Sequence, residues 1–199
     1  MKIIDKRNYK NFIEGGILKI QSFTRVELAG VDYLTINASN DNEIIVGDNC
    51  SIYCNDNNHI NVKHRCMIVA KNNCIINGGD YNEIGVDQNC KITVDDLNTV
   101  IARGYNTIRG GHFNTITVED NSDIIINNEG IVTIKGRNIN LKILDEGAMS
   151  TINNLATSSV ILTYNAMGTM KIYKTSKLKQ NEISVSNGKI SKEFNISMK

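Results

Sequence analysis

The chain has 199 residues, of which 41% are hydrophobic, and its 22 Lys and Arg nearly balance its 21 Asp and Glu, for a net charge of +1. This length and composition suffice for one elongated domain with a substantial core, and the near-neutral charge gives no indication of a nucleic-acid or acidic partner. The absence of Pro and Trp, together with heavy use of Ile, Asn and Lys, is typical of an AT-rich genome and favours a phage or low-GC bacterial source.

The N-terminal segment, MKIIDKRNYKNFIEGG, has no long apolar run and predicts neither a signal peptide nor a membrane span. Asp5 is a candidate cap for a short helix that ends at Gly15 and Gly16. The apolar face of this helix would contain Tyr9, Phe12 and Ile13. Because the open end of a repeat stack exposes unpaired strand edges, residues 1–17 are expected to form an N-terminal cap.

The stretch from Leu18 to Arg137 repeats itself every eight residues. From residue 42 the octads are NEIIVGDN, CSIYCNDN, NHINVKHR, CMIVAKNN, CIINGGDY, NEIGVDQN, CKITVDDL, NTVIARGY, NTIRGGHF, NTITVEDN, SDIIINNE and GIVTIKGR. In all of them the third position is Ile or Val. Three looser octads precede this run, with Ile20, Leu28 and Ile36 at the third position.

Within each octad, apolar or small residues at positions 1, 3 and 5 alternate with mostly polar residues, which is typical of a strand with one buried face. Positions 6 to 8 are rich in the turn formers Gly, Asp and Asn. Such a short unit cannot bury its own apolar face and must stack on copies of itself. The sequence therefore predicts an all-β parallel β-solenoid over residues 18–141, with Asn ladders that fix the register between coils.

Two octads per coil would give a flattened solenoid, and three would give a triangular one. A coil of three octads stacks similar corner residues better: it brings Tyr81 onto Tyr105 and aligns Asn58, Asn82 and Asn106, as well as Asp48, Asn72, Asp96 and Asp120. A coil of two octads instead gives a mixed column of Arg65, Tyr81, Leu97 and Phe113. We therefore predict a three-sided coil of three octads, stacked about five times at the strand spacing of roughly 4.8 Å.

The inward Ile and Val columns and corner Asn ladders resemble the right-handed parallel β-helix superfamily of pectate lyases and phage tailspikes. The resemblance covers the repeated stretch and concerns the fold alone, and it implies right-handed coils. Enzymes of that superfamily build a substrate groove on long loops, whereas the corners here are uniformly short. No catalytic position carries over.

After Arg137 the octad pattern breaks, since Asn140 stands where an Ile is expected. The remaining residues, 142–199, keep strand-like runs, and Asn187-Gly188 predicts a tight hairpin turn. This β-rich segment either caps the last coil or pairs with another subunit, because both arrangements cover the exposed strand edge.

Two groups of candidate metal ligands are predicted to be structural. Four cysteines at position 1 and one at position 5 point inward as small fillers, and their spacing matches no zinc signature. Their odd number, without an export signal, favours free thiols in a reducing compartment. The cysteines are Cys50, Cys54, Cys66, Cys74 and Cys90. The second group is the histidines, which are expected to be solvated corner residues too far apart to share a ligand. They are His59, His64 and His112. No metal or cofactor is indicated.

Four carboxylates, Asp95, Asp96, Glu119 and Asp120, are expected on adjacent coils of one corner. Carboxylates about 5 Å apart would suit a retaining glycosidase or a divalent cation. The same residue types are also the commonest corner formers, so we favour a solvated corner.

Exposed aromatic residues beside arginine are the strongest candidates for a binding site. They are Tyr81, Tyr105 and Phe113, with Arg103 and Arg109 close by in the chain. Such residues form hot spots for protein recognition and can stack on sugars or bases. The alternative is that the tyrosines merely brace each other across coils.

These features predict binding without catalysis. The expected protein is a phage-type solenoid in the host cytoplasm that presents a rigid face to a host protein, as an inhibitor or in an anti-defence role. The alternative is a structural part, such as a tail-fibre segment in the virion or a filament former, that oligomerises through the solenoid ends or the C-terminal strands. A carbohydrate-active enzyme is the third hypothesis. No membrane partner is expected.

Overall fold

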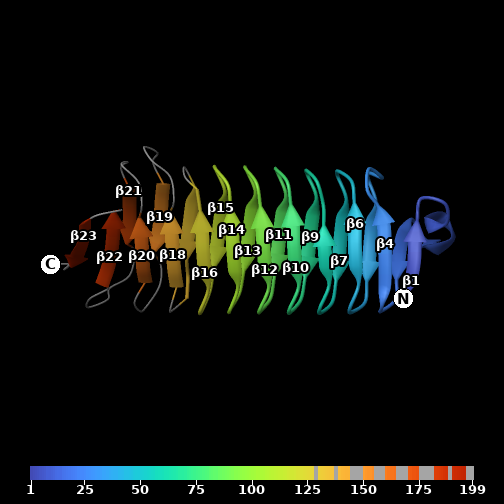
Figure 1. The fold of residues 1–199 in the computed structure, drawn as a ribbon, viewed down its shortest axis with the longest axis horizontal. Coiled ribbons are helices and arrows are strands. Elements are labelled where there is room, and N and C mark those ends of the chain that lie inside the picture. Colours follow the sequence, from blue (N-terminus) through green and yellow to red (C-terminus); the bar gives the residue numbers. More distant parts are fainter. Residues whose placement is uncertain are drawn as a thin grey trace.

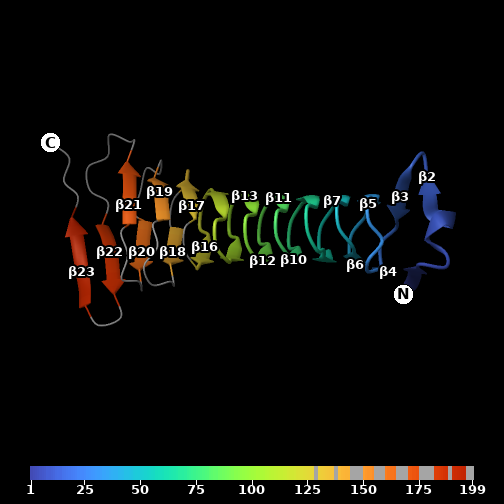
Figure 2. The same cartoon turned by 90° about the horizontal axis from the view of Figure 1, so that it is seen from above.

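The computed structural model describes residues 1–127, 130–136 and 139–142 with their side chains and, further on, the backbone of the strands up to residue 195. The chain forms a long parallel β-solenoid in which successive coils stack along one axis (Figure 1). Turned by 90°, the stack shows two layers of strands, with β1 (Lys2–Asp5) at one end and β23 (Ile190–Asn195) at the other (Figure 2). The predicted all-β parallel solenoid is confirmed.

Two sheets form these layers. Sheet A has ten strands in the order β1, β4 (Thr24–Leu28), β6 (Glu43–Val46), β8 (His59–Asn61), β10 (Ile75–Gly78), β12 (Lys91–Val94), β14 (Thr107–Gly110), β16 (Asp123–Ile126), β18 (Ile139–Ile143) and β20 (Val160–Tyr164). Sheet B has eleven, in the order β2 (Ile13–Glu14), β3 (Ile17–Ile20), β5 (Thr35–Ala38), β7 (Ser51–Cys54), β9 (Met67–Ala70), β11 (Glu83–Val86), β13 (Thr99–Ala102), β15 (Thr115–Val118), β17 (Ile131–Ile134), β19 (Ser150–Asn154) and β21 (Met170–Lys174).

Each regular coil contains two octads, because a strand pairs in register with the strand that lies two octads further along the chain. Ile44 pairs with Ile60, and Ile60 pairs with Ile76. The predicted three-sided coil of three octads is therefore wrong: a coil has two sides, with one strand in each sheet. The chain passes from sheet A to sheet B at a first edge and returns from sheet B to sheet A at a second edge.

The cause of this error lies in the corner residues. The inward Ile and Val columns are the same for either coil length, so the prediction depended on stacking similar corner side chains, which are exposed and need not match. The small residues at position 5, such as Ala70, Gly78 and Ala102, are a better guide. Because they leave space, the two sheets can pack against each other across a thin core.

Third-position residues from both sheets fill this core. Those with no exposed surface include Ile44, Ile52, Ile60, Ile68, Ile76, Ile92, Ile108 and Ile116. Burial of each such side chain contributes roughly 2 kcal/mol relative to an exposed one. The inward assignment of position 3 is thereby confirmed.

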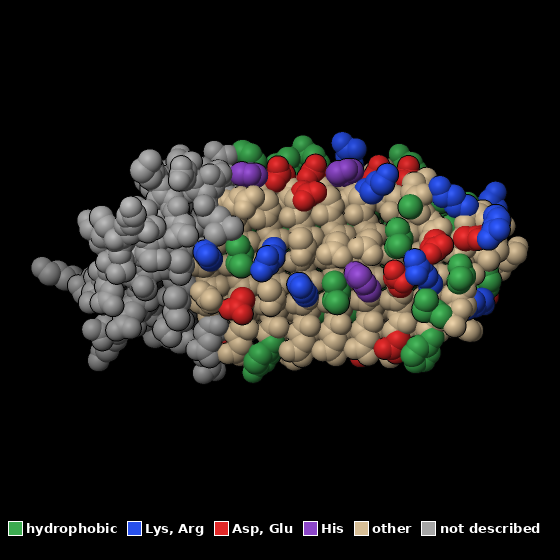
Figure 3. Space-filling model, in the orientation of Figure 1, with side chains coloured by type: hydrophobic (Ala, Val, Ile, Leu, Met, Phe, Trp, Pro, Cys, Tyr) green, Lys and Arg blue, Asp and Glu red, His purple; other side chains and the backbone are tan. Residues whose placement is uncertain are grey.

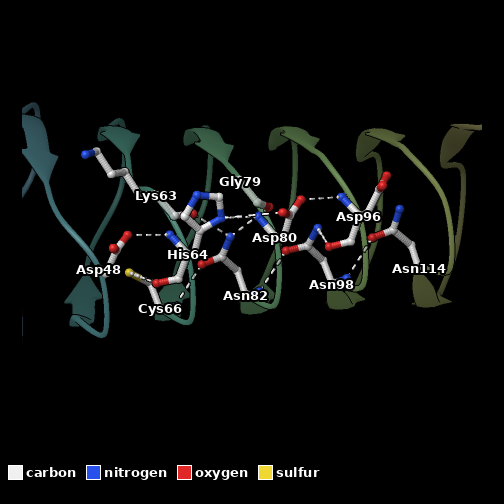
Figure 4. Close-up of polar contacts among 10 residues, drawn as sticks. All are labelled: Asp48, Lys63, His64, Cys66, Gly79, Asp80, Asn82, Asp96, Asn98 and Asn114. Carbon is white, nitrogen blue, oxygen red and sulfur yellow. Dashed lines mark hydrogen bonds and ion pairs between the residues drawn. The ribbon is translucent and has the colours of Figure 1, made fainter.

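Buried polar residues at position 1 join the coils, as the sequence predicted (Figure 4). The predicted column of Asn58, Asn82 and Asn106 is wrong, however, because neighbours in a ladder are 16 residues apart and Asn82 lies on the opposite edge. The backbone N–H of Asn82 donates to Oδ1 of Asn98 at 2.8 Å, and the N–H of Asn98 donates to Oδ1 of Asn114 at 2.8 Å. Nδ2 of Asn82 donates to the corner carbonyls of Lys63 and Gly79, each at 3.0 Å. Each of these side chains therefore links one coil to the next, and a shifted register would leave their amide groups without hydrogen-bond partners.

The N-terminal end is covered as expected, with differences in detail. The short helix is a 3-10 helix, η1 (Tyr9–Phe12), and Tyr9 and Phe12 pack against the core. Ile13 instead begins β2, which pairs antiparallel with β3. Asp5 does not cap η1; its carboxylate accepts hydrogen bonds from Arg7.

The first coils are longer than the regular ones. Leu18 pairs with Ile36, which lies more than two octads further along the chain, so Leu18 and not Ile20 belongs to the column of third positions. Ile20 pairs with Ala38 and Leu28 pairs with Val46, so both lie in the column of fifth positions, and both are buried. The looser octads therefore fold into coils in which extra corner residues shift the pattern.

Parallel stacking also continues past residue 141, the predicted end of the solenoid. Asp123 pairs with Asn140, one residue beyond the regular spacing, and Ile131 pairs with Thr151, at a still longer spacing. The octad pattern ends because the coils lengthen, and the parallel pairing extends to β20 and β21. Beyond them, β22 (Glu182–Asn187) and β23 pair antiparallel, while the predicted turn at Gly188 lies outside the described residues.

Candidate functional site

The structure separates the five residues of the predicted binding patch. Tyr81 and Phe113 lie on the first edge, whereas Tyr105 and Arg103 lie on the second edge, and Arg109 projects from β14 on the outer face of sheet A. The expected stacking of Tyr81 on Tyr105 is wrong, because three octads make one and a half coils and lead to the opposite edge. The aromatic residues therefore do not form one site together.

The first edge instead carries a continuous stripe on four successive coils, which we call the corner stripe. It consists of Arg65, Tyr81, Leu97 and Phe113. The guanidinium of Arg65 lies 5.6 Å from the centroid of the Tyr81 ring, within the range of a cation–π contact. Tyr81 is 52% exposed, Leu97 43% and Phe113 52%. At one strand spacing per coil, the stripe is about 14 Å long.

Leu97 and Arg65 are not among the residues that the sequence analysis selects. The sequence does contain the signal, because a coil of two octads produces this column directly. A search for columns of chemically similar residues does not detect it, because arginine, tyrosine, leucine and phenylalanine are chemically different. They share exposure and bulk, and these properties matter for recognition.

The stripe residues also share a backbone conformation that bulky side chains rarely adopt, as do Phe23, Tyr33 and Tyr105 at other corners. Each stripe residue is in the left-handed region, with φ between 55° and 60°. Asparagine occupies the equivalent position at five other corners, at Asn49, Asn57, Asn73, Asn89 and Asn121. A bulky residue is strained there, whereas Asn is tolerated. The bulky residues of the stripe therefore carry backbone strain, and substitution by asparagine would relieve it.

This strain predicts that Leu97→Asn raises the free energy of unfolding by about 1 kcal/mol, the cost of a left-handed conformation for an ordinary residue. The reverse change on the second edge, Asn89→Leu, should lower it by about the same amount. Urea denaturation followed by circular dichroism measures both. A less stable Leu97→Asn protein would show that Leu97 is kept for packing.

The outer face of sheet B begins just after the stripe in each coil and carries almost no charge. Along the described strands from β9 to β17, Glu83 is its only charged residue. The other outward residues of these strands are Met67, Val69, Gly85, Thr99, Ile101, Thr115, Thr117, Ile131 and Thr133. Val69 is 48% exposed and Ile101 57% exposed. This face therefore combines low charge with exposed aliphatic side chains set among threonines, a composition compatible with contact to another macromolecule.

The outer face of sheet A is different, since charged residues run along its strands (Figure 3). They include Arg25, Glu27, Glu43, Lys91, Arg109 and Asp123. Arg25 pairs with Glu27 at 2.6 Å. Mixed charge suits a solvated face. The two faces of the solenoid therefore differ in charge, although sheet A also exposes apolar side chains such as Ile75.

The acidic corner does not exist as predicted. Asp95 and Asp96 lie on the first edge, whereas Glu119 and Asp120 lie on the second edge, with the core between the two pairs. The carboxylates of the first edge also have a structural task (Figure 4). Oδ1 of Asp96 accepts a hydrogen bond from the backbone N–H of His112 at 2.7 Å, linking two coils.

His64 belongs to the same ladder. Its backbone N–H donates to Oδ1 of Asp48 at 3.0 Å, and its Nδ1 accepts from the backbone N–H of Asp80 at 2.9 Å. The imidazole therefore replaces an aspartate as an acceptor. His112 lies three coils away on the same edge, roughly 14 Å at one strand spacing per coil, so these two histidines cannot share a ligand.

The five cysteines are buried free thiols, as the sequence predicted. Those at position 1 take the place of asparagine in the ladders: Sγ of Cys66 accepts from the backbone N–H of Cys50 at 3.3 Å. Among the side chains that the structure describes, no three His, Cys, Asp or Glu residues lie where they could hold a metal ion.

A cavity of about 430 Å³ lies at the N-terminal end of the stack. Ile4, Ile20 and Phe12 contribute apolar walls, and Lys2 and Glu14 contribute charge. Nζ of Lys2 lies 4.1 Å from the centroid of the Phe12 ring, and Glu14 pairs with Lys19 at 2.9 Å. These groups contact one another, which is consistent with a cap that closes the solenoid end.

The two-sided parallel β-solenoid thus has, beside the corner stripe, one nearly uncharged face that exposes aliphatic side chains and threonines. No protein-family model, curated protein or solved structure matches the chain. Within the described part of the chain, no helix has the length and apolar character needed to cross a membrane.

Proposed function

We propose that this protein binds another protein without catalysing a reaction, through the corner stripe and the adjoining sheet B face. The observation that carries the proposal is the run of exposed, bulky side chains in a strained backbone conformation on four successive coils. Tyrosine and arginine are enriched in the hot spots of protein interfaces. A rigid β scaffold presents them at a small cost in entropy on binding.

The edges support binding over catalysis. Their carboxylates hold successive coils together, as Asp80 does by accepting from the backbone N–H of Asp96 at 2.9 Å. The two-octad coil also removes the predicted clustering of Asp95 and Asp96 with Glu119 and Asp120, on which the glycosidase hypothesis rested. Kinship with the pectate-lyase and tailspike superfamily is proposed for the fold alone. A phage origin, with a host protein in the host cytoplasm as the inhibited partner, is the biological setting that the composition favours.

A second candidate function is self-assembly. The low charge of the sheet B face favours it, because two such faces could pack together without burying unpaired charge. Light scattering of the purified protein separates the candidates: a monomer favours recognition of another protein, and a discrete oligomer or a polymer favours assembly.

The binding surface is tested with the variant Tyr81→Asn/Leu97→Asn/Phe113→Asn. Because asparagine is the commonest natural residue at this corner position, the variant should fold at least as stably as the wild type and lose its partner. The measurement is a pull-down from bacterial lysate, read by mass spectrometry, followed by titration of the purified partner. Loss of two or three hot-spot side chains should weaken binding at least about 100-fold.

The matched control is Tyr105→Asn on the second edge, which should bind like the wild type. Capture of the same protein by wild type and triple variant with equal affinity would exclude the corner stripe. Recovery of the protein itself alone would favour self-assembly.

A further inference from the structure

Four of the five cysteines form two pairs on successive coils. Cys50 and Cys66 occupy the position 1 column of the first edge, and Cys74 and Cys90 occupy that of the second edge. The strands that follow them are in register, since β7 pairs with β9 and β10 pairs with β12 residue for residue. The Cα atoms of each pair are therefore one strand spacing apart, about 4.8 Å, within the range of about 4.4–6.8 Å that a disulfide spans.

The side chains of each pair also lie within reach of each other along the stack. The backbone N–H of Cys74 donates to Sγ of Cys90 at 3.4 Å, as that of Cys50 does to Cys66. Each of these thiols donates to corner carbonyls, as Sγ of Cys50 does to the carbonyl of Asp48 at 3.4 Å. The neighbouring side chain of Cys66 lowers the pKa of Cys50, and those of Cys54 and Cys90 lower the pKa of Cys74. Each pair therefore combines a thiol that ionises more readily with a protonated neighbour.

We propose that hydrogen peroxide oxidises this protein at these two pairs, forming the disulfides Cys50–Cys66 and Cys74–Cys90 that join successive coils. The thiolate of Cys50 attacks one peroxide oxygen, the O–O bond breaks, and the hydroxide released takes up a proton to give water. The sulfur of Cys66 then attacks the sulfenic sulfur of Cys50. The S–S bond forms as the S–O bond breaks, and the hydroxyl leaves as water with the Cys66 proton.

Two thiols thus lose two electrons and two protons, and one peroxide is reduced to two waters. The same steps apply to Cys74, as the attacking thiolate, and Cys90. The fifth cysteine, Cys54, also neighbours Cys74, but it lies within the sheet B strand β7 and not in the column that holds Cys74 and Cys90. It is expected to stay reduced.

Reagent access does not require the sheets to come apart. Although the cysteines are buried, their sulfurs lie at the edges of the core: Sγ of Cys66 contacts the corner carbonyls of Gly47 and His64 at 3.4 Å each. Peroxide is a small neutral molecule, and local opening of a corner exposes the thiol without global unfolding. Each disulfide closes a loop of one coil, so oxidation should raise the thermal midpoint of unfolding.

The test treats the purified native protein with hydrogen peroxide, alkylates the remaining thiols in denaturant, digests with trypsin and reads the peptides by mass spectrometry. Cys74 and Cys90 lie in one tryptic peptide, 72–91, so their bond appears as the loss of two hydrogens from that peptide. The bond between Cys50 and Cys66 joins peptide 26–63 to peptide 66–71. We expect both products and a higher thermal midpoint.

Alkylation of all five cysteines after treatment would overturn the proposal. Bonds from Cys50 to Cys74 and from Cys66 to Cys90 would overturn it too, because they correspond to a coil of three octads.

Two variants assign the bonds. Cys54→Ser should keep both disulfides, which settles the connectivity because peptide 26–63 also contains Cys54. Cys66→Ser should lose the first bond alone and still fold, since serine occupies position 1 naturally at Ser122, whose Oγ accepts from the backbone N–H of Asn106 at 3.2 Å.

Discussion

Replacing Ile92 with aspartate should abolish soluble folding of the protein. Ile92 lies in the middle of the stack on β12, has no exposed surface, and is flanked in its column by Ile76 and Ile108. A carboxylate at this point would be surrounded by aliphatic side chains with no cation or hydrogen-bond donor to compensate it. An uncompensated buried charge costs at least about 4 kcal/mol, a large part of the stability of a domain of this size.

The matched control is the next residue on the same strand. Thr93 faces outward from sheet A between Asn77 and Arg109, so Thr93→Asp adds the same charge to the solvated face. It should express normally and change the free energy of unfolding by less than about 0.5 kcal/mol. The two variants are compared by their yield of soluble protein and by thermal unfolding followed by circular dichroism. An Ile92→Asp protein with normal thermal stability would contradict the inward assignment of position 3.

The strands and the core could be predicted from the sequence because they depend on local alternation. Inward residues such as Ile92 recur at a fixed position in every octad, and the burial of that position follows from the two-residue period of a strand. The coil length could not be obtained in the same way. The coil length is the number of octads after which the chain returns to the same sheet. The inward columns do not reveal this number, because they are equally regular with two or three octads per coil.

The proposed binding surface was only partly predictable for the same reason. The sequence indicates Tyr81 and Phe113 as exposed aromatic residues near arginine, but their grouping with Tyr105 depends on the coil length. Leu97, which lies between them on the stack, is an ordinary exposed leucine when it is considered alone. It becomes part of a site only when the two-octad coil places it beside two aromatic neighbours.

Asn98→Ala should destabilise the solenoid by about 2–3 kcal/mol, because it leaves a buried backbone donor without an acceptor and creates a small cavity. Asn98 is 1% exposed. Its Oδ1 accepts from the backbone N–H of Asn82 at 2.8 Å, and its Nδ2 donates to the carbonyl of Asp96 at 2.9 Å. The carbonyl of Asp96 also accepts from the N–H of Tyr81, so the larger loss falls on the Asn82 donor.

The chain itself supplies the matched control for this prediction. At the same position of another coil, Cys66 offers its sulfur as acceptor to the coil before it and donates to a corner carbonyl. Asn98→Cys should therefore recover about half of the stability lost by Asn98→Ala, since sulfur is a weak acceptor. Urea denaturation of the two variants under reducing conditions measures the difference in the free energy of unfolding. Equal losses would mean that position 1 requires only a small side chain; a smaller loss for cysteine would show that the ladder of acceptors itself holds successive coils in register.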